Sequence, residues 1–264
     1  EGKFSHAAVF PLAPGTTDPT SKVHTPAVAA MLCNFSPPSK DEKEPSMLSH
    51  DEVETFFHEF GHVMHNMCSE VELPKFAGTQ VERDFVECPS QMLENWVWQV
   101  EPLRAISGHW KTGEPIPDSL LGPLLKSRQA NSGTTNLRQL TFGIFDQRLH
   151  GQFPYSSLSG LMKMTRRDVE HIDEPNEACM PCSWGHMSGY DAQYYGYMWS
   201  LVFAADMFKT RFLADGLFES KAGKDYRRMI LAKGGSLDAS EMLRDFLGRD
   251  PSTDAFFELI GVGG

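Results

Sequence analysis

Two histidines one helical turn apart flank a glutamate in the stretch His58-Glu59-Phe60-Gly61-His62. Imidazoles at positions i and i+4 of a helix can bind one Zn²⁺, and a glutamate between them lies beside the metal, where it can take a proton from bound water. The spacing therefore predicts one zinc ion per chain, with His58 and His62 as ligands and Glu59 as the general base. The alternative is that these are ordinary residues of an exposed helix surface.

The residues around this motif predict the helix that must carry it. Ser49 followed by Glu52 forms a capping box, which predicts a helix over roughly 50–68. Apolar residues then recur at steps of three and four, which predicts one apolar stripe on the core side and the histidines on the opposite, open face. The stripe consists of Val53, Phe56, Phe57, Phe60, Val63, Met64 and Met67.

A catalytic zinc site needs a third protein ligand and an open position for water. Glu87 lies in an apolar stretch, where a buried charge requires a metal or a partner such as Arg83. His65 is the rival third ligand, but its Cα lies about 10 Å along the helix axis from that of His58. Glu87 is therefore favoured. The residues one turn on either side, predicted to orient a ligand, are Asp84 and Gln91.

Three tyrosines form the second candidate feature. Tyr190, Tyr194 and Tyr197 share one face of a helix predicted over 190–214. An aromatic stripe usually belongs to a core, but three phenols need hydrogen-bond partners if they are buried. Beside a zinc ion, their O–H groups could stabilise the oxyanion of a peptide under attack. His186 could act in the same way or be an ordinary loop histidine.

Composition excludes several classes of protein. A net charge of −11 argues against a nucleic-acid partner, whose phosphates require a basic face. No apolar run approaches the roughly 20 residues of a membrane span. Five cysteines are an odd number spread over 264 residues, which favours a reducing compartment and free thiols at Cys179 and Cys182. The first residue is not Met, which indicates a cut end within a longer protein.

The remaining patterns predict a mainly helical architecture with a small β-sheet next to the zinc helix. Apolar runs over 7–10 and 27–35 predict two strands, and a polar loop follows over 37–45, so 1–48 forms a small sheet and loop. Helical periodicity over 81–100 either begins or bends at Pro89. Further helices are predicted near 118–130, 134–150, 156–170, 224–233, 238–247 and 252–260.

Residues 58–65, 81–96 and 189–197 resemble motifs of the thimet oligopeptidase and neurolysin group of zinc metallopeptidases. The likeness covers nearly all of 1–264. It implies a zincin-like catalytic domain with zinc at the floor of a narrow channel, cleavage of short peptides including neuropeptides, and a cytoplasmic location. It also implies that His58, His62 and Glu87 are the zinc ligands and that Glu59 is the catalytic base. Tyr197 then stabilises the transition state, and Tyr190, Tyr194 and His186 contact the substrate.

The chain departs from this family in two ways. Its members are considerably longer, and the resemblance implies that the missing N-terminal portion of the same enzyme supplies the opposite channel wall. This chain is then the C-terminal catalytic portion, and the alternative function is a peptide-binding module with an intact zinc site but little turnover. The stretch 151–185 matches poorly, and the spacing from His186 to Tyr190 is one residue short. A purely structural zinc domain is disfavoured because such sites are closed and rich in cysteine.

Overall fold

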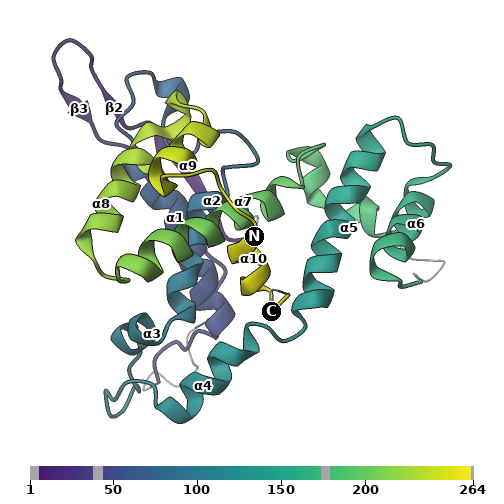
Figure 1. Cartoon of the computed structure of the whole chain (residues 1–264), viewed down its shortest axis with the longest axis horizontal. Coiled ribbons are helices and arrows are strands. Elements are labelled where there is room, and N and C mark those ends of the chain that lie inside the picture. The colour runs from purple at the N-terminus through teal and green to yellow at the C-terminus, as the bar shows by residue number, and fades with distance from the viewer. Residues whose placement is uncertain (1–5, 38–43, 174–178, 263–264) are drawn as a thin grey trace.

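The computed structural model describes residues 6–37, 44–173 and 179–262 of the chain. The architecture is mainly helical with little strand, as predicted (Figure 1). Within these residues, none of the helices combines the length and the apolar character that a membrane span requires. The α-helices are α1 (His50–Met67), α2 (Cys88–Glu94), α3 (Val100–Ile106), α4 (Asp118–Ser127), α5 (Ser132–His150), α6 (Leu158–Glu170), α7 (Gly196–Met207), α8 (Ser220–Met229), α9 (Ala239–Leu247) and α10 (Asp254–Leu259).

The predicted small sheet is present. Strand β1 (Ala8–Ala13) pairs antiparallel with β4 (Val28–Leu32), with Ala8 opposite Leu32. Both strands contact α1, so the sheet lies beside the helix that carries the two histidines. A second antiparallel pair, β2 (Thr16–Thr17) and β3 (His24–Thr25), forms a short ribbon. Most of the predicted polar loop over 37–45 lies outside the described residues.

One hydrophobic core joins α1 and α2 to α7, α8 and α9, which are gathered on one side of the molecule (Figure 1). Its largest fully buried side chains include Phe85, Met92, Met207 and Phe246. Helices α5 and α6 stand apart from this body and share a smaller cluster around Phe145. The polypeptide therefore forms a main body and an arm, and α7 runs between them.

Helix α1, which carries the two histidines, has the predicted boundaries but not the predicted orientation. Glu52 accepts a hydrogen bond from the Ser49 backbone N–H at 2.8 Å, as a capping box requires. The expectation that the apolar stripe faces the core is wrong, because Phe56 and Phe60 are each 40% exposed and stack on one another at the surface. The buried residues of α1 are Glu59, Gly61, His65 and Asn66. The histidine face is enclosed because it packs against α2.

Two other predictions are resolved by the backbone. Helix α2 begins at Cys88, so Pro89 occupies its first turn, where its missing N–H costs no helical hydrogen bond. The expectation of free thiols at Cys179 and Cys182 is wrong, because these residues form a disulfide with Cα atoms 5.6 Å apart. The short helical turn η3 (Met180–Ser183), which follows Cys179 and contains Cys182, brings the two side chains to bonding range. Among the described residues, Cys33, Cys68 and Cys88 are not part of a disulfide.

Candidate active site

The two histidines of α1 converge with a glutamate from the segment before α2. The Nε2 atom of His62 lies 3.1 Å from Oε2 of Glu87, and Nε2 of His58 lies 3.3 Å from the same oxygen. The three candidate ligand atoms lie within 4.8 Å of one another, and no other such group occurs among the described residues. Ligands at about 2 Å from a tetrahedral Zn²⁺ are roughly 3.4 Å apart. The donor set therefore fits one zinc ion and leaves a fourth position open.

Close approach of α1 and α2 makes this convergence possible. A Cβ atom at Gly61 would lie 2.5 Å from the Cα of Ser90 and 2.9 Å from the carbonyl oxygen of Pro89. Only a residue without a side chain fits between the two backbones. Since Gly61 immediately precedes His62 and Ser90 follows Glu87 by three residues, this contact sets the distance between the histidines and the carboxylate.

We therefore expect Gly61→Ala to separate the two helices. The substitution should lower the free energy of unfolding by about 1–3 kcal/mol, as overpacking does, and weaken zinc binding at the same time. Urea denaturation and zinc titration measure the two effects. Gly223→Ala in α8 is the matched control, because nothing lies within 4 Å of its Cβ position, so it should leave zinc binding unchanged. Equal zinc affinity in Gly61→Ala and the unchanged chain would contradict the role of this contact.

Outer contacts orient two of the three candidate ligands, His58 and Glu87. The Nδ1–H of His58 donates to Oε1 of Glu94 at 2.6 Å. Ser90 donates to Oε2 of Glu87 at 3.2 Å, and the hydroxyl of Tyr190 donates to Oε1 of Glu87 at 2.7 Å. Such partners hold a metal ligand in one orientation and raise its basicity. The Nδ1 atom of His62 is buried without a partner among the described residues.

The residues that orient the ligands differ from those suggested by the sequence. Asp84 accepts a hydrogen bond from the Tyr195 hydroxyl at 2.8 Å, and Gln91 donates to the backbone carbonyl of Tyr197 at 3.1 Å. Both therefore contact the tyrosine stretch rather than a ligand side chain. Glu94 was not among the residues predicted from the sequence, although an acidic residue inside an apolar helical run is a signal that it has a buried partner.

The pKa values of His58, Glu87 and Glu59 are all shifted at this site. Burial acts to lower the pKa of His58, but the hydrogen bonds that it donates to Glu87 and Glu94, together with the charges of these carboxylates, outweigh burial and raise this pKa to about 10. Burial acts in the opposite direction on Glu87, yet its bonds to the two histidines hold the pKa of this carboxyl well below its usual range. Glu59 is 7% exposed, and burial is the main cause that raises its pKa. A base with a raised pKa holds an abstracted proton more readily.

Neither alternative considered for this site, His65 as the third ligand or Arg83 as the partner of Glu87, is found in the structure. His65 is fully buried, and burial lowers its pKa to about 3. It is not a member of the group formed by the three ligand atoms. Arg83, the alternative partner of Glu87, instead stacks its guanidinium 5.3 Å from the centre of the Tyr190 ring.

The tyrosines lie near the candidate ligands, but the backbone that carries them is not the single helix that was predicted. The prediction of one helix over 190–214 is wrong at its start, because α7 begins at Gly196 and the residues before it form turns. Ala192 has a left-handed backbone, φ +59°, which interrupts helical geometry. The turn still places the rings of Tyr190 and Tyr194 5.0 Å and 5.1 Å from the ring of Tyr197. The three side chains are therefore grouped, but not by helical periodicity.

The phenols are held in their protonated form. Burial is the main cause that raises the pKa of Tyr197 and of Tyr190, and the nearby Glu87 carboxylate raises both further. Burial also raises the pKa of Tyr194 to about 12. All three hydroxyls therefore carry their protons at neutral pH and can donate hydrogen bonds.

The structure brings His186 to the tyrosines. Its ring centre lies 5.2 Å from that of Tyr194, 5.7 Å from Tyr197 and 5.9 Å from Tyr190. Burial is the main cause that lowers its pKa. The side chain is therefore biased toward the neutral form, in which it can donate one hydrogen bond and accept another.

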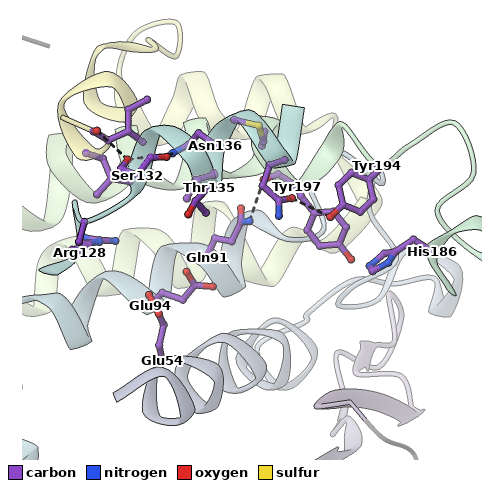
Figure 2. Close-up of a pocket in the computed structure, with 16 residues that line it drawn as sticks. Glu54, Gln91, Glu94, Arg128, Ser132, Thr135, Asn136, His186, Tyr194 and Tyr197 are labelled. Carbon is purple, nitrogen blue, oxygen red and sulfur yellow. Dashed lines mark hydrogen bonds between the residues drawn. The ribbon is translucent and has the colours of Figure 1, made fainter. Parts of the chain in front are cut away.

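A cavity of about 510 Å³ lies beside the candidate ligand group. Glu54, Gln91 and Glu94 line it on one side, and Arg128 and residues from the start of α5 lie across from them (Figure 2). His58, His62 and Glu87 do not line this cavity; it adjoins them through Glu94. Its other polar lining residues are Ser132, Thr135, Asn136, Gln139, His186, Tyr194 and Tyr197. Amides and hydroxyls in this arrangement suit an extended ligand with many hydrogen-bonding groups.

Comparison with known proteins gives consistent matches over most of the chain. Residues 1–262 match Peptidase family M3. A thimet-like oligopeptidase of Dictyostelium discoideum is 42% identical over 267 residues, saccharolysin of Saccharomyces cerevisiae is 42% identical over 269, and oligopeptidase A of Escherichia coli is 39% identical over 243. These alignments cover 99%, 99% and 90% of this chain, but 39%, 37% and 35% of the relatives. The chain thus spans less than two fifths of their length.

A solved structure of PZ peptidase A with inhibitor 2 has a similar fold. It superposes with a TM-score of 0.59 over 94% of this chain and 40% of that structure, at 14% sequence identity. At this identity the similarity concerns the fold alone.

Proposed function

This chain belongs to peptidase family M3, and from this premise we propose that it is a zinc-dependent endopeptidase that hydrolyses internal bonds of short peptides. The observation that carries the proposal is the convergence of His58, His62 and Glu87 within 4.8 Å of one another, beside the buried carboxyl of Glu59. This arrangement supports roles as zinc ligands for the first three and as the general base for the fourth.

The chain's own groups account for the remaining chemistry. A zinc ion at this site would supply a water molecule of lowered pKa and polarise the carbonyl of the substrate. Glu59 would accept the proton of the attacking water and pass it to the amine that leaves. The hydroxyl of Tyr197 would donate a hydrogen bond to the carbonyl oxygen as negative charge develops there. Its raised pKa supports this role, since only the protonated phenol can donate.

We propose that the cavity beside the ligands receives one arm of the peptide. Tyr194, Tyr197, His186, Gln91 and Asn136 are among the residues that line this cavity. These side chains offer donors and acceptors for peptide groups, and Tyr190 would contact the substrate close to the scissile bond. Binding of this kind selects extended chains over folded proteins, which supports short peptides as the substrate class.

The second candidate function is peptide binding with little turnover. It is favoured by one observation: the chain spans 39% of the length of the thimet-like relative and 37% of saccharolysin. The portion of the relatives outside these alignments would supply the opposite wall of the peptide channel and act as the partner of this domain. Without that wall, an intact zinc site would hold a peptide but seldom attain the geometry of attack.

We also propose a cytoplasmic location. Three of the five cysteines, Cys33, Cys68 and Cys88, lie outside the disulfide, which supports a reducing compartment, although the Cys179–Cys182 disulfide argues in the opposite direction. A relative from Arabidopsis thaliana that is 36% identical is named a probable cytosolic oligopeptidase A, whereas another from the same plant is named for chloroplasts and mitochondria. Cell fractionation with an antibody against this chain tests the assignment.

Turnover of an internally quenched fluorescent peptide tests the proposed function. The chain is assayed as purified, after chelation and after zinc is restored, with bound zinc measured in each sample. Activity that is lost with the chelator and regained with zinc supports the endopeptidase. Peptide binding without cleavage at one zinc per chain supports the second candidate. Absence of both zinc and peptide binding would contradict the two functions together.

We expect zinc uptake by the metal-free chain to release a proton. The pKa of His58 is raised to about 10 in the absence of metal, so its ring is protonated at pH 7, whereas a zinc ligand must be neutral. Apparent zinc affinity should therefore increase about tenfold per pH unit as pH rises toward that pKa. Chelator competition at several pH values from 6.5 to 8.5 measures the slope. An affinity independent of pH would show that His58 is already neutral.

A further inference from the structure

The turn that precedes α7 rests on one face of α5. Gln139, Gly143, Asp146 and Gln147 follow one another at helical steps that keep them on the same side. The Tyr194 hydroxyl donates to Oε1 of Gln139 at 3.0 Å. A Cβ atom at Gly143 would lie 3.5 Å from the Cα of Tyr195, the residue that follows Tyr194, and this is van der Waals contact. Helix α5, in the arm of the molecule, thus contacts the turn that carries the tyrosines.

The closest attachment is made by Asp146. This carboxylate has no exposed surface. Its Oδ1 accepts the backbone N–H of Ala192 at 2.9 Å, and its Oδ2 accepts the backbone N–H of Tyr194 at 3.0 Å. His150, one turn later on α5, lies with Nδ1 2.9 Å from Oδ1. Hydrogen bonds from backbone amides to a buried carboxylate are stronger than those between neutral groups.

These contacts hold the turn in a conformation that it would otherwise seldom adopt. Ala192 has φ +59°, in the left-handed region that residues with a side chain rarely occupy. Asp146 binds the N–H of this residue, and the Nε2 of Gln147 donates to its carbonyl oxygen at 2.7 Å. Two adjacent residues of α5 therefore hold both polar groups of the left-handed residue.

The start of α7 is attached to a different part of the molecule. A Cβ atom at Gly196 would lie 2.9 Å from the Cα of Asp84, and the Ser200 hydroxyl donates to the Asp84 carbonyl at 2.7 Å. The position of Tyr197, next to Gly196, is thus set by the segment that leads to Glu87. The positions of Tyr190 and Tyr194 depend on α5.

We propose that Asp146 is a positioning residue of the active site. It fixes the turn so that the Tyr190 hydroxyl meets Glu87 and the Tyr194 ring lines the peptide cavity. The kinetic part of this inference rests on the proposed function. The structural part, that one buried carboxylate holds the turn, does not.

The test is Asp146→Asn, whose amide keeps one acceptor but presents a donor to a backbone N–H. We expect kcat/KM to fall about 10- to 100-fold, as small displacements of substrate-contacting groups do. In a background of Tyr190→Phe the same substitution should cost much less, because both changes act on one contact. The near-UV circular dichroism of the packed aromatic cluster should also decrease.

Asp206→Asn is the matched control. Asp206 is 2% exposed and likewise accepts a backbone N–H, that of Ser252 at 2.7 Å, but it lies away from the turn. It should change stability without changing the near-UV spectrum. Ala192→Gly added to Asp146→Asn should restore about fivefold of the lost kcat/KM, because glycine adopts the left-handed conformation without strain.

Each outcome has a distinct meaning. An equal loss in the Tyr190→Phe background, or an unchanged near-UV spectrum, would overturn the positioning role. If Asp146→Asn does not fold, Gln147→Ala takes its place, since it removes the other contact to Ala192 from an exposed position; an unchanged spectrum there would also overturn it. A chain that binds zinc without turnover, yet loses the near-UV signal in Asp146→Asn, would contradict the proposed function and support the positioning role.

Discussion

Glu59→Gln is expected to reduce kcat about 10²- to 10⁴-fold, the typical contribution of a general base, while bound zinc stays at one per chain. The side chain sits on α1 between the two histidines and is 7% exposed. Glutamine has nearly the same shape but cannot accept a proton from water. The loss should therefore fall on the chemical step and leave peptide affinity nearly unchanged.

Steady-state kinetics together with metal analysis measures both halves of this expectation. Glu101→Gln is the matched control, because Glu101 is an exposed glutamate in the first turn of α3 and should keep full activity. A Glu59→Gln protein that retains turnover would remove this residue from the mechanism. A Glu59→Gln protein that loses zinc would show that the carboxylate supports metal binding instead.

For Tyr197→Phe we expect kcat to fall about 10²- to 10³-fold, with much less change in KM. The phenol is half-buried, and burial together with the nearby Glu87 carboxylate raises its pKa and keeps its proton in place; its ring packs against those of Tyr190 and Tyr194. The hydroxyl would donate most strongly when the carbonyl oxygen becomes an anion. Its removal should therefore destabilise the transition state more than the bound substrate.

Tyr195→Phe provides the control from the same stretch. Its ring is 42% exposed, and its hydroxyl donates to Asp84 rather than toward the metal ligands. This variant should keep nearly normal kcat. Equal activity in Tyr197→Phe and the unchanged chain would exclude the hydroxyl from the reaction, and a rise in KM alone would assign it to substrate binding.

Sequence patterns were sufficient where the chemistry depends on residues close together in the chain. The capping box and periodicity around His58 and His62 predicted α1 to within a residue or two, because capping and helical spacing are local. Glu87 was singled out because an acidic residue between apolar neighbours needs a partner when buried. The mainly helical architecture and the small sheet followed from the same local rules.

Helical periodicity did not predict which face of α1 is buried, because this depends on packing against a distant segment of the chain. An apolar stripe predicts which side of α1 is hydrophobic, but not that the opposite face would be buried by α2 through the backbone contact at Gly61. Only the tertiary structure shows Phe56 and Phe60 at the surface and the histidines enclosed. The energy that decides this orientation comes from packing and charge pairing between segments, neither of which local spacing contains.

The same limit applies to the residues that complete the site. Glu94 reaches His58 from another helix, and the left-handed turn at Ala192 is held by Asp146, which is 46 residues away in the chain. The sequence by itself determined which residues could bind zinc and activate water. Folding decided how they meet, because hydrogen bonds between distant segments can override the helical preference of a short tyrosine-rich stretch.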